Sequence, residues 1–192
     1  MSDRISAIVA ESLDVKRRFF EAHAADIERA AELIARAVNE GGKVLVFGNG
    51  GSAADAQHIT GELVNRFLQD RRALPAIALT TDGGVLTCIA NDTGFENVFA
   101  RQVEALGAKG DICLAISTSG TSPNIVFACE RARTQDIKVI GLLGRDGGTV
   151  AALCNLALIV PSNDTQRVQE THNLVGHILC ELVEEKLFPA EN

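Results

Sequence analysis

Histidine, glutamate and glutamine side chains occur at spacings that could hold a metal ion. His58 and Glu62 are four residues apart in a segment predicted to be helical, so they project from one face. Gln169 and His177 are eight residues apart on a second predicted helix, on neighbouring faces. Two imidazoles, a carboxylate and an amide suit a zinc-like divalent ion. His172 also lies close to Gln169, and the residues alone do not choose between His172 and His177.

Two loops rich in glycine and hydroxyl groups could hold a phosphate. The first spans residues 47–55 (FGNGGSAAD), where we expect Ser52 to be the N-cap of the next helix. The second spans residues 117–122 (STSGTS) and precedes a helix predicted over 124–133. Hydroxyls and free N–H groups at a helix N-terminus suit a phosphate dianion. Serine-rich turns also cap helices, so simple capping is the alternative interpretation of the second loop.

A nucleotide site is the rival interpretation of the first loop. Gly48, Gly50 and Ala53 fit the pattern G-x-G-x-x-A of dinucleotide-binding loops. The acidic residue expected ~20 positions later, at the end of a second strand, would fall in FLQDR, before a loop broken by proline. The sequence contains no GxxxxGK[ST] motif for nucleoside triphosphates. These observations argue against a nucleotide site.

The elements that position these residues alternate between short apolar runs and helical patterns. This alternation predicts an α/β fold with a parallel sheet and helices on both faces. We expect one domain over residues 1–192: N-terminal helices over 1–40, read as two helices, and an α/β core over 41–192 ending in a long helix near 166–187. The predicted strands cover residues 43–47, 76–79, 112–116, 139–143 and 157–160.

Composition excludes several classes of protein. With 18 basic and 25 acidic residues the net charge is −7, which argues against a broad nucleic-acid surface. No window approaches the ~20 apolar residues of a membrane span, and the first residues do not form a secretion signal. Five cysteines without a CxxC pair suggest a reducing compartment, so we expect a cytoplasmic protein. Apolar residues in excess on the first helix suggest burial between subunits: Ile5, Ile8, Val9, Leu13, Phe19 and Phe20.

Taken together, five segments resemble those of phosphoheptose isomerases, a family of sugar-isomerase (SIS) domain proteins. They are GNGGSAADAQHITGEL, IANDTGFENVFARQV, AISTSGTSPNI, GLLGRDGG and RVQETHNLVGH, and the similarity runs over about residues 5–187. The resemblance implies a flavodoxin-like three-layer fold with a five-stranded parallel sheet, and a homotetramer with its sites at subunit interfaces. It implies one zinc ion per subunit on His58, Glu62, Gln169 and His177, which makes His172 the weaker candidate. The implied substrate contacts are Asn49, Gly50, Gly51, Glu62, Asn91, Asp92, Ser117, Thr118, Ser119, Ser122 and Gln169, with Ser52 as a further candidate.

The resemblance also implies a reaction. Sedoheptulose 7-phosphate would be isomerised to D-glycero-D-manno-heptose 7-phosphate through a metal-assisted enediol, the first step toward the nucleotide-activated (ADP- or GDP-) heptose of bacterial surface glycans such as lipopolysaccharide. We expect Glu62 to be the base and His177 to exchange protons with the substrate oxygens. The alternative is a non-catalytic sister group of SIS proteins that binds the bacterial replication initiator protein; a sugar-phosphate-binding regulator ranks below both. The sister group does not keep the Glu and the second His of the metal set, whereas this sequence has both.

Overall fold

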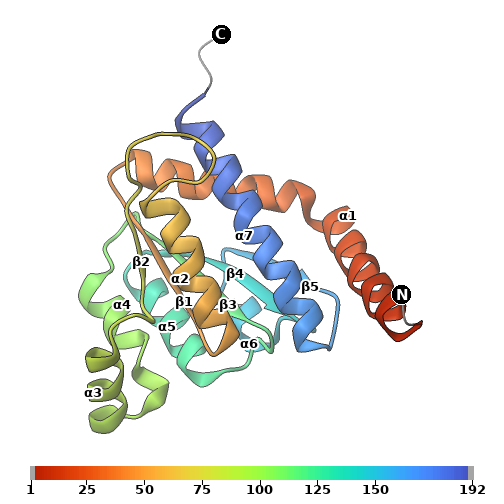
Figure 1. Cartoon of the computed structure of the whole chain (residues 1–192). Helices are drawn as coiled ribbons and strands as arrows, with labels where there is room; N and C mark the ends of the chain where they lie inside the picture. The colour runs from red at the N-terminus through yellow and green to blue at the C-terminus, as the bar shows by residue number, and fades with distance from the viewer. Residues whose placement is uncertain (1–2, 190–192) are drawn as a thin grey trace.

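The chain alternates five parallel strands with helices (Figure 1). The computed structural model describes residues 3–189. The strands are β1 (Val44–Gly48), β2 (Ala76–Ala78), β3 (Ile112–Ser117), β4 (Lys138–Gly144) and β5 (Leu156–Val160). The helices are α1 (Asp3–Asn39), α2 (Gly51–Val64), α3 (Gly83–Thr93), the 3₁₀ helix η1 (Phe95–Asn97), α4 (Ala100–Leu106), α5 (Pro123–Thr134), α6 (Gly148–Ala151) and α7 (Thr165–Leu187). Each predicted strand lies within two residues of an observed one.

The strands form one parallel sheet in the order β2-β1-β3-β4-β5. This is the flavodoxin-like order, so the prediction from resemblance is confirmed. The strand order reverses between β1 and β3, which pair in register from Val44 with Ile112 to Gly48 with Ile116. The loops after these two strands are residues 49–50 and 118–122, which belong to the two glycine- and hydroxyl-rich segments. They therefore meet at the edge of the sheet where such folds bind ligands.

Alternate strand residues build two cores. Val44 and Val46 face α1, α2 and α7, whereas Leu45 and Phe47 face α4, α5 and α6. Because both faces of the sheet are covered, its strands are almost continuously apolar, which is why short runs of Val, Ile and Leu identify them in the sequence. Packing of α7 against both α1 and α2 places the last helix between the two earlier ones (Figure 1).

The prediction of two N-terminal helices was wrong, because residues 3–39 form one helix of 37 residues. The segment contains no glycine or proline that would end a helix, and Ala22, Ala24 and Ala25 lie where a break would be needed. Its second half is buried against the sheet, whereas its first half extends past the body of the molecule (Figure 1). Ile8, Val9 and Leu13 are exposed there by 43%, 47% and 62%. Within residues 3–189, no helix is both long and apolar enough to cross a membrane.

Candidate functional site

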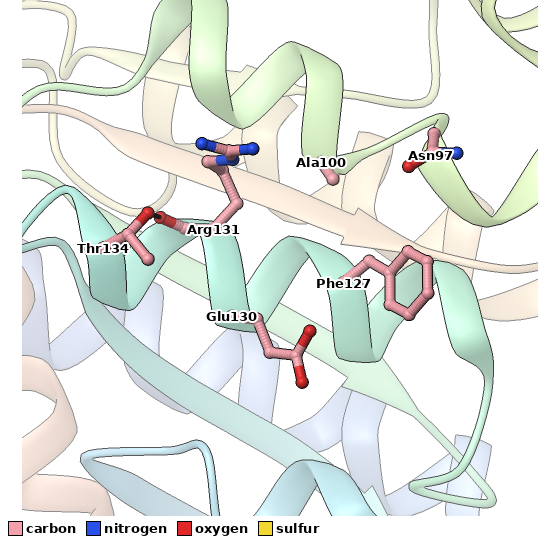
Figure 2. Close-up of a pocket in the computed structure, with 6 residues that line it drawn as sticks. All are labelled: Asn97, Ala100, Phe127, Glu130, Arg131 and Thr134. Carbon is pink, nitrogen blue, oxygen red and sulfur yellow. Dashed lines mark hydrogen bonds between the residues drawn. The ribbon is translucent and has the colours of Figure 1, made fainter. Parts of the chain in front are cut away.

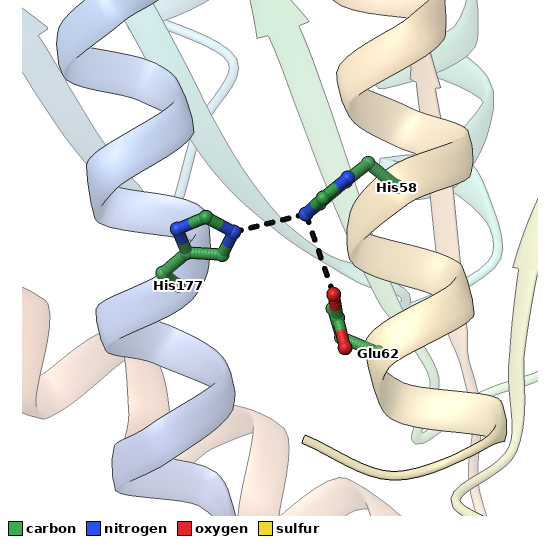
Figure 3. A group of neighbouring side chains, drawn as sticks. All are labelled: His58, Glu62 and His177. Carbon is green, nitrogen blue, oxygen red and sulfur yellow. Dashed lines mark hydrogen bonds and ion pairs between the residues drawn. The ribbon is translucent and has the colours of Figure 1, made fainter. Parts of the chain in front are cut away.

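Three side chains from α2 and α7 converge between these helices (Figure 3). Nε2 of His58 lies 2.9 Å from Nε2 of His177, and 3.4 Å from Oε1 of Glu62. The candidate ligand atoms of all three residues lie within 4.8 Å of one another. His58 is exposed, and Glu62 and His177 are half-buried, so the cluster is open to a solute. The carboxylate and imidazole that the sequence placed far apart thus meet within one chain.

Close packing of α2 on α7 makes this convergence possible. Gly176, the residue before His177, is buried, and a Cβ placed there would lie 2.8 Å from two side-chain carbons of Ile59. Ile59 in turn follows His58 directly. A larger residue at position 176 would separate the helices at the level of the cluster. Because position 176 has no side chain, α2 and α7 can approach closely at the level of the two imidazoles.

The first loop lies against the N-terminal part of α7. A Cβ on Gly51 would lie 2.5 Å from Nε2 of Gln169, so the Gln169 amide covers the start of α2. Asp55, one turn later on α2, forms a hydrogen bond with Asn173 of α7. Burial raises the pKa of Asp55, while Asn173 and the nearby His58 act in the opposite direction. Asp55 and Asn173 were not among the predicted site residues, although both lie one turn from a predicted ligand.

The cluster fits the donor set and spacing of a zinc ion. Two nitrogens bound to a tetrahedral zinc, each about 2.0–2.1 Å from the ion, lie about 3.3 Å apart. The separation of 2.9 Å between Nε2 of His58 and Nε2 of His177 differs from this by a few tenths of an ångström. Because the two nitrogens point at each other, they can accept one cation, or share one proton when no cation is bound. Glu62 offers an oxygen ligand within the cluster, whereas the Gln169 amide lies against Gly51 at the start of α2.

His172, left as an alternative ligand by the sequence, lies elsewhere. It is 1% exposed, and its Nε2 is 3.0 Å from the carbonyl oxygen of Leu143 at the end of β4. Since a carbonyl only accepts, Nε2 carries the proton, and Nδ1 has no partner in the described part of the chain. Burial lowers the pKa of His172 to about 4, against the opposing effect of the Leu143 hydrogen bond. His172 is therefore a neutral core residue that faces the sheet.

The second loop uses its serines as internal acceptors. Ser117 Oγ accepts a hydrogen bond from Gly120 N at 3.1 Å, and Ser119 Oγ accepts from Thr121 N and Thr121 Oγ1, both at 3.2 Å. A hydroxyl whose lone pairs are engaged in this way keeps its own O–H free to donate. Ser117 is buried, whereas Thr118, Ser119 and Ser122 are half-buried at the surface of the loop. The loop can therefore present O–H donors to an anion.

Asn49 and Asn124 join the two loops. Each side-chain amide donates to the other, with Nδ2–Oδ1 distances of 2.9 and 2.8 Å. The pair borders a cavity of about 310 Å³ that Phe95, Glu96, Ser122 and Pro123 also line. Asn124 and Glu96 were not among the predicted site residues. Both lie inside the segments that carry the family resemblance, so their position beside the predicted contacts was the available signal.

Three other predicted residues take unexpected positions. The prediction of Ser52 as an N-cap was wrong: α2 begins at Gly51 with Gly50 as its N-cap, and Ser52 is buried inside the first turn. The tight turn after β1 leaves no residue free before the helix, because Ser52 N already bonds to Asn49 O. Asn91 and Asp92 lie exposed at the end of α3, where Asn91 donates to Asp92. Their side-chain hydrogen bonds stay within α3, which lies at the opposite end of the molecule from the start of α1 (Figure 1).

A separate cavity of about 270 Å³ lies between α5 and the segment that leads into α4 (Figure 2). Its lining residues are Asn97, Ala100, Phe127, Glu130, Arg131 and Thr134. None of them is a predicted site residue, and Figure 2 shows no interaction between Glu130 and Arg131. The candidate site is therefore the cluster between α2 and α7 together with the two loops, and not this cavity.

Comparison with known proteins places this arrangement in a family. Residues 9–144 match the SIS domain model. A protein of Aquifex aeolicus named phosphoheptose isomerase is 52% identical over 185 residues, covering 96% of this chain and 97% of its own length. Solved phosphoheptose isomerases of Neisseria gonorrhoeae and Francisella tularensis superpose with TM-scores of 0.90 and 0.92 at 42% and 41% identity. Both cover 95% of this chain, and 98% and 97% of their own chains respectively. The resemblance seen in the sequence is thereby confirmed, and the chain belongs to the phosphoheptose isomerases, a family of sugar isomerases with the SIS fold.

Proposed function

We propose that this protein isomerises sedoheptulose 7-phosphate to D-glycero-D-manno-heptose 7-phosphate. The observation that carries the proposal is the meeting of Glu62 with His58 and His177, within 4.8 Å, in a chain whose loops after β1 and β3 are rich in phosphate-type donors. An aldose–ketose isomerase needs this combination of a base, a proton carrier and an anion site. The product would serve as precursor of the nucleotide-activated heptose in bacterial surface glycans such as lipopolysaccharide.

His58, Glu62, Gln169 and His177 would hold one zinc ion per subunit. Zinc bound there would supply Lewis acidity, which polarises a carbonyl oxygen and stabilises negative charge that develops on it. The fit of the two imidazole nitrogens supports this assignment. Glu62 would also act as the base of the reaction. Its carboxylate must therefore keep one oxygen available to accept a proton while it lies next to the zinc ion.

Glu62 would remove a proton from C1 of the open-chain ketose and return it to C2. This gives an enediol and then the aldehyde at C1. His177 would deliver a proton to O2 and remove one from O1, so that the protons balance over the complete reaction. Because Nε2 of His177 would hold the zinc ion, this exchange would use Nδ1 of the same ring; the imidazole lies between α2 and α7, where Glu62 also lies (Figure 3). Both groups therefore reach one substrate from neighbouring helices.

The second loop would hold the phosphate of the substrate. Ser119, Thr118 and Ser122 present hydroxyls at the N-terminus of α5, and Ser117 supports the loop from below. Asn49, Gly50 and Gly51 would contact the sugar from the first loop. Binding energy from the phosphate then positions the reacting carbons, which contributes to the rate as well as to affinity.

The active protein would be a homotetramer with its sites between subunits. Helix α3 carries Asn91 and Asp92, and no residue of this fully described helix is buried in the protomer. The exposed apolar residues on the first half of α1 also favour contact with a second subunit. A second subunit that covers these surfaces would bring Asn91 and Asp92 to the site of its neighbour. We also propose a cytoplasmic location, because the cysteines are free thiols, of which three are buried.

One incubation tests the proposed activity. Protein treated with a chelator and then supplied with zinc should convert sedoheptulose 7-phosphate, and the chelated protein should not. Product identity would be read by NMR or by mass spectrometry after reduction, with Asp111→Asn as a folded variant altered far from the cluster. If the zinc-loaded wild type leaves the ketose unchanged, and instead captures the bacterial replication initiator protein, the adaptor function replaces the isomerase.

A further inference from the structure

A buried carboxylate on α7 organises the loop that follows α2. Glu184 is 1% exposed and lies seven residues after His177, so the two side chains share one face of α7, two turns apart. It accepts hydrogen bonds from the backbone N–H groups of three successive residues at 2.8, 2.9 and 3.0 Å, and from Arg71 Nε at 2.8 Å; the three residues are Phe67, Leu68 and Gln69. Four donors therefore converge on one carboxylate.

The side chain of Arg71 extends this contact to the end of α2. Its Nη2 donates to the carbonyl oxygen of Glu62 at 2.8 Å, and its Nη1 donates to that of Leu63 at 2.8 Å. Carbonyls in the last turn of a helix lack partners within the helix, so the guanidinium caps this end. Because one of the two carbonyls belongs to Glu62, the guanidinium holds the main chain of a proposed metal ligand.

The same loop places an aromatic ring on the other half of the cluster. The ring of Phe67 stacks on the imidazole of His177, with centroids 5.5 Å apart and planes inclined by 17°. The backbone N–H of the same Phe67 donates a hydrogen bond to Oε1 of Glu184. A path of contacts therefore runs from His177 along α7 to Glu184, across to Phe67, and back to His177.

The hydrogen bonds to Glu184 are better explained by a role in fixing one loop conformation than by a contribution to folding stability. Burial raises the pKa of Glu184, but the three N–H donors and Arg71 together outweigh it and lower the pKa, so the group is ionised at neutral pH. A buried ion pair costs desolvation, and apolar residues of the same volume often give equal or greater stability. Directional hydrogen bonds that converge on one carboxylate instead hold residues 67–71 in a single conformation. That conformation orients His177 and Glu62 at once.

We propose that Glu184 and Arg71 form a positioning clamp, which seats Phe67 on His177 and fixes the backbone of Glu62, so that the cluster is oriented before metal and substrate bind. Glu184 and Arg71 are positioning residues, since neither belongs to the cluster. The expected effect on catalysis rests on the proposed function. The positioning of Phe67 and of the Glu62 backbone does not, because it concerns only contacts within this chain.

Glu184→Gln and Phe67→Leu test the clamp, and Asp111→Asn is the matched control. Asp111 is also a buried carboxylate, 2% exposed, that accepts from two backbone N–H groups and a cation, Lys43, but it lies at the start of β3. We expect Glu184→Gln and Phe67→Leu to weaken zinc binding by ~10-fold or more in a chelator competition, as loss of an outer contact to a metal ligand does. Asp111→Asn should lower stability alone, and Phe67→Tyr, which keeps the ring, should restore the affinity.

A readout without metal separates this proposal from the activity. The chain has four histidines, so histidine-labelled, metal-free protein gives few imidazole signals, and His177→Gln identifies the one that matters. Both test variants should shift the ring protons of His177: Phe67→Leu removes the ring current of Phe67, and Glu184→Gln displaces that ring. In both, kcat should fall with little change in KM. Unchanged zinc affinity and imidazole shifts in both variants would overturn the clamp. If the two variants shift these signals while the wild type leaves sedoheptulose 7-phosphate unconverted, the clamp is supported and only the isomerase is refuted.

Discussion

Acid should destabilise this protein through His172, which is buried as a neutral imidazole. Its pKa of about 4 lies below the value of 6.5 that an exposed histidine has. The unfolded chain therefore takes up a proton between these two values, while the folded chain does not. Because protons then bind preferentially to the unfolded state, the free energy of unfolding falls as the pH drops through this window, and it is unaffected by His172 above pH 6.5.

The size of this effect follows from the shift. One pKa unit corresponds to about 1.4 kcal/mol, so the full difference is on the order of 3 kcal/mol. Between pH 7.5 and pH 5, about 2 kcal/mol of this should be lost, since an unfolded histidine is almost fully protonated at the lower value. For a protein of this size such a loss is a large share of the usual 5–15 kcal/mol of stability.

The substitution His172→Gln isolates this contribution. Glutamine can still donate to the Leu143 carbonyl, but it does not titrate. Urea unfolding followed by circular dichroism suits a chain without Trp or Tyr, at one protein concentration and with chelator present. We expect the wild type to lose about 2 kcal/mol more than the variant between pH 7.5 and pH 5. His23→Gln, a change on α1, serves as control. Equal losses in the wild type and in His172→Gln would refute the reasoning.

Three further substitutions probe the site. Glu62→Gln should leave the circular dichroism spectrum unchanged and lower kcat by ~100-fold or more, as loss of a general base does, and normal turnover would assign the base elsewhere. Ser119→Ala should chiefly raise KM for the sugar phosphate, which steady-state kinetics would show; an unaltered KM would place the phosphate in another loop. Gly176→Ala should force α2 away from α7, because the new methyl group meets Ile59, and it should weaken zinc binding by ~10-fold in chelator competition. Combining it with Ile59→Val should recover part of the zinc affinity. Full zinc affinity in the single variant would contradict the packing argument.

The sheet could be predicted from the sequence because its physical signal is local. Buried parallel strands are short, continuous runs of branched apolar residues, so β3 and β4 were located within two residues. The N-terminal helix was misread for the opposite reason: no glycine or proline within residues 3–39 marks a boundary, so the sequence holds no local signal that decides between one helix and two. Predicted ligands such as His58 and His177 could be named from motif and spacing, and the structure brings these two together.

Contacts made by irregular segments escaped prediction. Residues 65–75 have neither helical nor strand periodicity, and the sequence gives no reason to connect Phe67 with His177 or with Glu184. That connection depends on backbone N–H groups and on a carboxylate more than a hundred residues away. His172 and His177 illustrate the same limit, since the two share one residue type on one helix. Only burial against β4 distinguishes the neutral core histidine from the half-buried one in the cluster.

The separation of 119 residues between His58 and His177 has a consequence for how the protein matures on the ribosome. A nascent chain that has emerged through α2 offers only His58 and Glu62, a weak pair for any cation. Until α7 leaves the exit tunnel and docks, the proposed zinc has no place to be captured. Metal acquisition would then be a checkpoint on complete synthesis, and truncated products that lack the last helix would remain metal-free and open to degradation.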